Sequence, residues 1–327
     1  MHRQTHPSRA HRQRPTEEPL RRLRRRVSTP AAALLLGALL GAGFPTAALA
    51  SAPGASGDQP AVGQGPSREP EPGATSRITQ ELDADLAGMR AGTHLSVSVQ
   101  ELGNGTTYDY HAEQRFVTAS AVKVDLLVLL MLKAQDERRA LTKDERDLLS
   151  PMIRSSDNDA AAEVYDRIGG AAGYREGAAR LGLTTTQPGP DDHWGKTETT
   201  VGDRLRVLRT VFTVDSPLSQ EHRAYAVELM GTVDRDQAWG VSAAGDPGGS
   251  EVKNGWVPRS ADHGKWAINS TGHIEHNGRF YLVAVLSDHH PDEATGIKHV
   301  EQAATTAVDG LDRSLSGPGA RAPHAAL

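Results

Sequence analysis

Ser120 and Lys123 stand three residues apart, directly ahead of the apolar run 126–132. Residues three apart on a helix share a face, so this hydroxyl and this amine can hydrogen-bond. Burial lowers the pKa of a lysine, which can then take the serine proton. The pair therefore predicts an activated serine nucleophile. The alternative is that Ser120 caps the helix, while Lys123 lays its apolar stem along the surface and keeps its amine in water.

Two further motifs carry polar side chains that acyl transfer could use. Ser156-Asp157-Asn158 falls in a break between two predicted helices, where the same residue types also suit a turn and a helix N-cap. Lys253-Asn254-Gly255-Trp256 lies in a predicted strand. A glycine in a strand lets another backbone or a ligand approach closely. Taken singly, each motif is compatible with a purely structural role.

The elements around these motifs follow from hydrophobic periodicity. Gly103-Asn104-Gly105 predicts a turn between the first two strands. The expected elements, in chain order, are a helix (78–89), strands (95–100, 108–110), a mostly helical middle (120–233), strands (252–257, 266–274, 279–287) and a helix (297–311). This order predicts an α/β (α+β) fold, in which an antiparallel sheet is flanked by N- and C-terminal helices and joined to a helical lobe. We expect a small-molecule site in the cleft between sheet and lobe.

The two ends of the chain have the composition of targeting and tail segments. Residues 1–50 combine nine arginines, an apolar run from Ala31 to Phe44 and small residues before Ser51. This pattern predicts a signal peptide cleaved near Ala50-Ser51, and hence a secreted protein with no membrane span after cleavage. Residues 51–76 are interpreted as a Pro/Gly/Ala-rich linker, 77–314 as the catalytic domain and 315–327 as a disordered tail.

Composition excludes several other classes of protein. The 327 residues contain no cysteine, which removes disulfide scaffolds, thiolate zinc sites and lipid attachment through a cysteine. Beyond residue 50 the chain has 27 basic and 39 acidic residues, so we expect no nucleic-acid partner, and we expect a monomer. No phosphate-binding glycine loop or dinucleotide fingerprint occurs, so no cofactor is expected. His273 with His276, or His289 with His290, could suggest a metal pair, but no ordered set of three ligands is evident and no metal is expected. Trp194, Trp239, Trp256 and Trp266 are interpreted as core or rim residues, with Trp256 and Trp239 as the ones that could line the cleft.

The order of the three motifs is more specific than any one of them. Ser-x-x-Lys, then Ser-Asp-Asn, then Lys-x-Gly on a late strand resembles the class A β-lactamases and related penicillin-binding serine enzymes. Ile168-Gly169-Gly170, after the second motif, also resembles this family, and the resemblance spans residues 77–314. It implies a secreted serine hydrolase that opens β-lactam rings through an acyl-Ser120 intermediate.

Carried over by motif, the resemblance implies a role for each side chain of the first two motifs. Ser120 would be the acylated nucleophile and Lys123 the proton acceptor beside it. Ser156 would relay a proton to the leaving nitrogen. Asn158 would hold the amide side chain of the substrate and help fix Lys123, whereas Asp157 would tie the turn to the helix that follows.

The third motif would bind substrate. Lys253 would supply positive charge for the substrate carboxylate, and Asn254, where the family usually has Thr or Ser, would replace a hydroxyl contact by an amide contact. Gly255 would allow close approach, and the backbone N–H groups of Ser120 and Trp256 would form the oxyanion hole.

One departure from the family bears on turnover. The Glu-x-x-Leu-Asn segment that carries the deacylating glutamate in class A enzymes is missing, and residues 184–200 contain only Asp191, Asp192 and Glu198 as acids. Asp192 is a possible deacylation base, although its side chain is one methylene shorter, and the alternative is a loop acid facing solvent. We therefore expect ready acylation and slow deacylation. The alternatives are a penicillin-binding sensor or sink without turnover, and an esterase or D-alanyl peptidase of the same fold.

Overall fold

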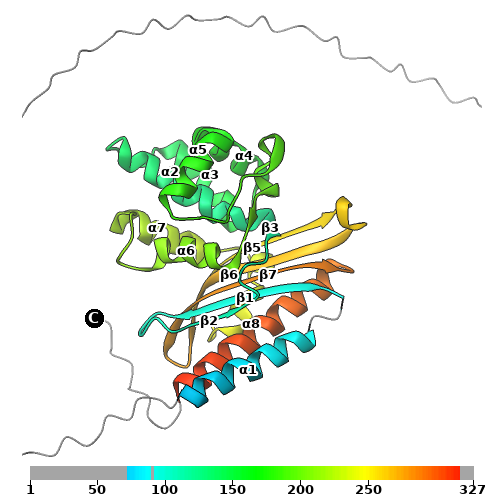
Figure 1. The fold of residues 1–327 in the computed structure, drawn as a ribbon. Coiled ribbons are helices and arrows are strands. Elements are labelled where there is room, and N and C mark those ends of the chain that lie inside the picture. Colours follow the sequence, from blue (N-terminus) through cyan, green and yellow to red (C-terminus); the bar gives the residue numbers. More distant parts are fainter. Residues whose placement is uncertain (1–71, 90–91, 317–327) are drawn as a thin grey trace, which may run out of the picture. The chain divides into compact units, whose positions relative to one another are not determined.

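A computed structural model describes residues 72–89 and 92–316 of the chain (Figure 1). The predicted signal peptide, most of the predicted linker and residues 317–327 of the predicted tail lie outside these residues. The first helix, α1 (Pro72–Met89), begins within the stretch predicted as linker. A proline is compatible with the first turn of a helix, where its missing N–H costs no hydrogen bond, so Pro72 marks the start rather than a break.

The described residues form the predicted antiparallel sheet, with five strands in the order β2-β1-β7-β6-β5. Every predicted strand is present, with slightly wider bounds than its periodicity gave. The strands are β1 (His94–Glu101), β2 (Thr107–Tyr110), β5 (Ser250–Arg259), β6 (Lys265–His276) and β7 (Arg279–His290). A separate two-stranded sheet pairs β3 (Phe116–Val117) with β4 (Glu198–Thr199).

Strand β7 shows how the sheet separates two hydrophobic cores. Successive strand residues point to opposite faces. Val283 and Val285 pack with residues of α1 and of α8 (Glu293–Leu315), whereas Leu282, Ala284 and Leu286 pack with the helical lobe. Figure 1 shows the two terminal helices side by side along one face of the sheet and the lobe on the opposite side. The α+β class predicted from the element order is confirmed.

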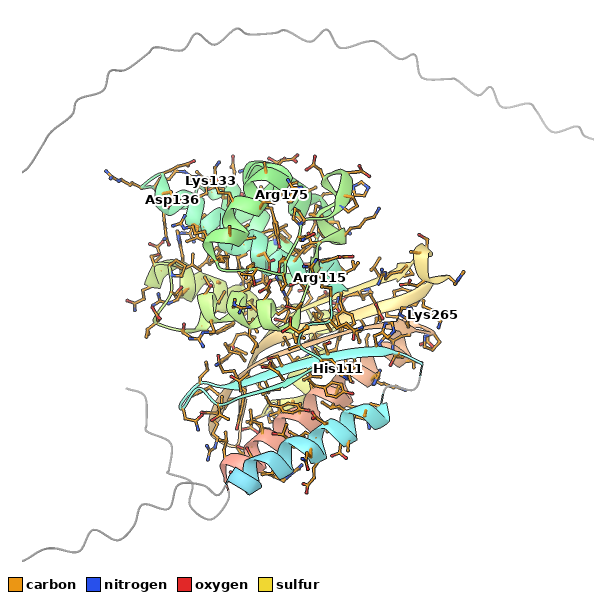
Figure 2. All side chains as sticks on the ribbon, viewed as in Figure 1. His111, Arg115, Lys133, Asp136, Arg175 and Lys265 are labelled. Carbon is orange, nitrogen blue, oxygen red and sulfur yellow. The ribbon has the colours of Figure 1, made fainter. Side chains whose placement is uncertain are left out.

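The helical lobe is built around α2 (Lys123–Asp136), whose residues from Lys123 to Leu132 are all buried. Its charged side chains Lys133 and Asp136 are exposed at the last turn, where the helix leaves the core (Figure 2). The other helices of the lobe are α3 (Lys143–Arg154), α4 (Asn158–Arg167), α5 (Gly170–Arg180), α6 (Val201–Phe212) and α7 (Gln220–Met230). Short 3₁₀ helices are η1 (Ala119–Val122), η2 (Pro190–Asp192), η3 (Trp194–Lys196), η4 (Arg235–Gln237), η5 (Gly240–Ala244) and η6 (Ser260–Asp262).

A buried ion pair anchors the start of α2. Asp125 accepts two hydrogen bonds from the Arg204 guanidinium of α6, at 2.5 and 2.8 Å, and a third from the Tyr174 hydroxyl of α5. Both charged side chains are almost fully buried. A buried charge is tolerated only when it is paired and hydrogen-bonded, so these contacts fix α2 against two neighbouring helices. The helix that carries Lys123 is thereby held in a defined position.

Candidate active site

The three motifs predicted from the sequence come together around the amine of Lys123. This side chain is fully buried at the start of α2. Its Nζ donates to the Ser156 carbonyl oxygen at 2.5 Å, to Ser156 Oγ at 3.1 Å and to Asn158 Oδ1 at 2.8 Å. The first motif is therefore bonded directly to the second, which forms the turn between α3 and α4.

The third motif reaches the same serine from the sheet. Lys253 on β5 donates from Nζ to Ser156 Oγ at 3.0 Å and to the Asn254 carbonyl oxygen at 2.9 Å. Ser156 Oγ thus lies within hydrogen-bond distance of two lysine amines. Asp157 accepts from the Ala160 N–H at 2.7 Å and caps α4, as expected for the residue that ties the turn to the following helix.

The two buried amines have depressed proton affinities. Burial lowers the pKa of Lys123 to about 7, and the charge of Asp157 opposes part of this shift. The pKa of Lys253 is lowered well below its usual value, first by burial and then by the charge of Lys123. Near neutral pH a substantial fraction of Lys123 is therefore uncharged, and an uncharged amine can accept a proton from a hydroxyl.

Ser120 lies in η1, immediately before α2, and is partly exposed. It is not a helix cap, since the N-cap positions are Thr118 for η1 and Val122 for α2, and the buried amine of Lys123 is not in water. The alternative interpretation of this pair is therefore wrong. The predicted hydrogen bond between Ser120 and Lys123 is also missing. Within the described residues, the hydrogen bonds of Lys123 Nζ go to Ser156 and Asn158.

Gly255 brings the sheet into contact with the backbone that carries Ser120. A Cβ at this position would lie 2.5 Å from both Ala121 N and Thr118 O, and 2.8 Å from Ser120 N. Cβ contacts under 3.0 Å are essentially never seen in proteins, so a larger residue would force the two segments apart. The close backbone approach predicted for this glycine is confirmed. On the next strand, Asn269 Nδ2 donates to the Thr118 carbonyl oxygen at 3.1 Å and holds the same segment.

Asn254 makes a different contact from the one predicted. Its Nδ2 donates to the carbonyl oxygens of Gln237 and Trp239, at 2.7 and 2.9 Å, and the side chain is 1% exposed. The physical reason is strand periodicity: since Lys253 faces Ser156, its neighbour faces the other side of the sheet. In place of the predicted amide contact to a substrate carboxylate, the structure gives Asn254 a contact that holds the segment before β5.

A cleft of about 530 Å³ opens beside these motifs. The predicted site residues Ser120, Asn158 and Trp256 line it, together with Asp192 and Trp194. Its volume falls within the range usual for small-molecule sites. The sequence predicts for Trp194 only a core or rim position, and it assigns Trp239 and Trp256 to the cleft instead. No local sequence signal marks it as a site residue, because its importance comes from the chain fold.

The loop between α5 and α6 places an aromatic ring, rather than an acid, against the buried amine. Lys123 Nζ lies 5.1 Å from the centroid of the Trp194 ring. Asp192 is exposed and its Oδ1 accepts from the Ala171 N–H at 3.1 Å, near the start of α5. Among the described residues its hydrogen bonds include none to Ser120 or Lys123. This placement favours the alternative of a loop acid.

The donor set at the motifs is not one that holds a cation, because it consists of lysine amines, hydroxyls and an amide. Among the residues that the structure describes, the group that could hold a metal is His94, Asp288 and His289, on β1 and β7.

Residues 77–146 and 144–311 match the model of a family described as "Beta-lactamase enzyme family", which covers well over half of the sequence. The chain belongs to this family. Membership, together with the lysine and serine motifs already described, supports a serine hydrolase of the class A β-lactamase fold.

This chain is similar to mycobacterial proteins over most of its length. It is 27% identical over 237 residues to "Putative lipoprotein LppW" of Mycobacterium bovis and Mycobacterium tuberculosis, covering 71% of this chain and 74% of the relative. The 327 residues of this chain contain no cysteine that could carry a lipid. None of the helices in residues 72–89 and 92–316 is long and apolar enough to cross a membrane.

Solved structures share the fold at low sequence identity. A variant of PBP-A, in an acyl-enzyme complex with penicillin G, aligns with a TM-score of 0.62 at 18% identity over 73% of this chain and 97% of its own. The TLA-1 extended-spectrum β-lactamase aligns with a TM-score of 0.63 at 16% identity over 71% and 99%. At these identities the alignments establish the fold, and activity must be argued from the site.

The packing of Gly255 predicts a large effect of a single methyl group. Gly255→Ala should lower the free energy of unfolding by about 1–3 kcal/mol, because the new Cβ overpacks the backbone at Ser120 and Ala121. The matched control is Gly88→Ala in α1, where a Cβ meets nothing within 4 Å and should stabilise the helix by up to about 1 kcal/mol. Urea denaturation measures both. Equal stability of the two variants would contradict the tight packing.

Proposed function

We propose that this protein is a serine enzyme whose Ser120 is acylated readily by β-lactams and deacylated slowly. The proposal places it outside the cytoplasm, on the signal-peptide pattern of residues 1–50. The observation that carries it is the convergence of the Lys123 and Lys253 amines on Ser156 Oγ, with Asn158 Oδ1 also bonded to Lys123, beside a cleft lined by Ser120.

Acylation requires two proton transfers, and the site has a group for each. In the first step uncharged Lys123 takes the proton of Ser120 Oγ as that oxygen bonds to the carbonyl carbon of the lactam. In the second, the carbon–nitrogen bond breaks and Ser156 Oγ gives its proton to the leaving nitrogen. The amines of Lys123 and Lys253, at 3.1 and 3.0 Å from Ser156 Oγ, return a proton to it.

Binding and charge stabilisation fall to the groups around the cleft. The backbone N–H groups of Ser120 and Trp256 form the oxyanion hole, on two segments that Gly255 allows to pack closely. Lys253 attracts the substrate carboxylate. Asn158 lines the cleft, and its Oδ1 accepts a hydrogen bond from Lys123. Its Nδ2 is therefore available to the amide side chain of the substrate.

Slow deacylation follows from what covers Lys123. Hydrolysis of the acyl-enzyme needs a base that activates a water molecule near the ester carbon. The indole of Trp194 lies over Lys123 and lines the cleft, and the nearby acid Asp192 bonds to the start of α5. A bulky apolar ring in this position excludes water and supplies no base.

The first test is intact-protein mass spectrometry during exposure to excess penicillin, sampled from seconds to hours. We expect an adduct of one penicillin that persists, and no adduct on Ser120→Ala, because the alanine has no nucleophile. The variant should unfold at the wild-type denaturant concentration, which serves as the control for its fold. An adduct on Ser120→Ala would exclude this serine.

The other outcomes of that experiment separate the alternatives. An adduct that clears while the penicillin is consumed would establish an efficient β-lactamase and refute slow turnover. If no adduct forms on the wild-type protein, β-lactams are not its acylating agents. Esters and D-alanyl peptides, the substrates of the alternative functions, would then be tested with the same readout.

The lowered pKa of Lys123 predicts how the acylation rate depends on pH. Since its pKa is lowered to about 7, the uncharged fraction should rise about tenfold per pH unit below 7 and level off above it, and the acylation rate constant should follow. Stopped-flow acylation by a chromogenic cephalosporin measures it. Lys123→Arg remains charged and should slow acylation at least about 100-fold, with this rise lost. A wild-type rate independent of pH between 6 and 8 would refute the assignment of Lys123 as base.

Trp194 predicts that deacylation can be accelerated. Trp194→Glu should place a carboxylate near the acyl carbon and speed loss of the adduct. The expected acceleration is up to roughly 100-fold, the low end of what a positioned general base contributes. The charge of this carboxylate should also raise the pKa of Lys123 and slow acylation at neutral pH. Trp194→Gln is the matched control without a charge. If both variants deacylate equally fast, the ring acts only as a cover, and if neither does, the ring does not limit turnover.

A further inference from the structure

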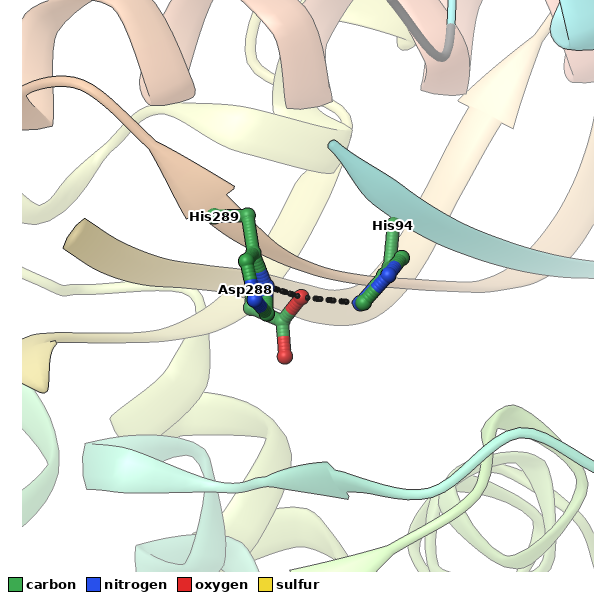
Figure 3. Close-up of side chains that lie close together, drawn as sticks. All are labelled: His94, Asp288 and His289. Atoms are coloured by element: carbon green, nitrogen blue, oxygen red, sulfur yellow. Dashed lines mark hydrogen bonds and ion pairs between the residues drawn. The ribbon is translucent and has the colours of Figure 1, made fainter. Parts of the chain in front are cut away.

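A second cluster of polar side chains lies where β1 begins and β7 ends (Figure 3). His94 Nδ1 lies 2.8 Å from Asp288 Oδ1, and His289 Nδ1 lies 2.6 Å from the same oxygen. One candidate ligand atom from each residue thus falls within 4.8 Å of the others. These residues are outside the groups to which acyl transfer was assigned, so the cluster can be judged independently of the proposed function.

The backbone of β7 is shaped so that these three side chains meet. His94 and Asp288 are direct partners in the β1–β7 register. In a regular strand Asp288 and His289 would point to opposite faces. The β6–β7 register, however, shifts here, since Trp266 pairs with His290 and Ile268 with Ser287. An extra residue of this kind is a β-bulge, and bulges re-aim side chains.

The bulge turns His289 toward His94. The backbone φ of His289 is +67°, in the left-handed region that residues other than glycine adopt uncommonly. The two imidazole rings lie with their centroids 4.3 Å apart, on either side of the carboxylate oxygen that both contact. Side chains from two paired strands are thereby presented together on a rigid part of the fold.

The charges around the cluster leave one carboxylate oxygen for a ligand. Arg259 Nη1 donates a hydrogen bond to Asp288 Oδ2 at 3.0 Å, and Arg259 Nε forms an ion pair with Asp262 Oδ2 at 3.0 Å. The guanidinium therefore fixes the orientation of the Asp288 carboxylate and keeps Oδ1 on the side of the imidazoles, as residues behind metal ligands commonly do. The Asp288 side chain is 6% exposed, whereas His94 and His289 are 45% and 29% exposed, so an ion can enter from solvent.

We propose that His94, Asp288 and His289 bind a divalent ion of the zinc type, through His94 Nδ1, Asp288 Oδ1 and His289 Nδ1. Two imidazoles and one carboxylate are a set that Zn²⁺ takes with water as the fourth ligand. Tetrahedral coordination needs ligand atoms about 3.3 Å apart, so the His94 ring must move outward by about 0.5 Å and the His289 ring by about 0.7 Å. Because both rings are partly exposed, rotation of the two side chains can produce this movement. The proton on each Nδ1 moves to Nε2, and the ion ties the first residue of β1 to the bulge of β7.

The test is titration of the full chain, made without a polyhistidine tag, with ZnCl₂ in a calorimeter. We expect one ion per chain, a rise in the thermal unfolding midpoint with added zinc, and affinity at least about tenfold weaker for His94→Ala and for His289→Ala. His263→Ala removes an exposed histidine of the neighbouring β5–β6 connection and should bind zinc as the wild type does. The d–d absorption bands of Co²⁺, added in place of zinc, should indicate four-coordinate geometry.

Two results would overturn the proposal. Saturable binding that is equally strong in the His94→Ala and His289→Ala variants would place the ion elsewhere on the chain. Absence of saturable binding by the wild-type protein would show that the cluster is held only by its own hydrogen bonds. The variant His289→Gln keeps a donor to Asp288 while removing the imidazole, so weakened binding in this variant cannot be attributed to a lost structural contact.

Discussion

Burial of the Lys123 ammonium group is the constraint around which the site is organised. An unpaired amine in this position would cost several kcal/mol, so the surrounding chain must supply acceptors. Three come from the turn between α3 and α4: the carbonyl and hydroxyl oxygens of Ser156 and the amide oxygen of Asn158. The backbone of Ser156 takes a positive φ of 59° to present both of its oxygens. That strained turn is retained because Asp157 caps the helix after it.

Strand β5 joins the sheet to the lobe through two positions of one face. Lys253 and Gly255 are two residues apart and so point the same way. Lys253 supplies an amine to Ser156, and Gly255 supplies empty space into which the Ser120 backbone fits. Asn254, between them, faces away and fixes the preceding segment. The position of Ser120 is therefore set jointly by a helix buried in one core and a strand that packs in the other.

The parts of this molecule that the sequence allowed us to predict are those governed by local periodicity. Local patterning and turn residues predicted all five strands of the main sheet, and the apolar run after Lys123 predicted the buried helix. The direction of Asn254 could have been predicted too, because it follows from that of Lys253. The ring of Trp194 over Lys123 and the pairing of Asp125 with Arg204 could not, since both join residues far apart along the chain.

The cluster of His94, Asp288 and His289 could not be predicted from the sequence for the same reason, because it joins residues far apart along the chain. Adjacency in the sequence pairs His289 with His290, but the closest polar partners of His289 include Asp288, which in turn bonds to His94 on another strand. The pairing of β1 with β7 and the bulge near Asp288 bring these three residues together. Neither feature can be recognised from a short sequence motif. The order of the motifs indicated the family, whereas the position of Trp194 against Lys123 required the contacts between elements.

Two lysine amines that share one hydroxyl oxygen have a consequence for ligand binding. Because burial disfavours the charge of both amines and the charge of Lys123 further disfavours one on Lys253, the unliganded site holds fewer protons than two free lysines would. An anion that enters beside Lys253 reverses this balance, and the site must then take up a proton from the solvent. The heat of anion binding will therefore vary with the ionisation enthalpy of the buffer, and anions will bind more tightly in mildly acidic solution.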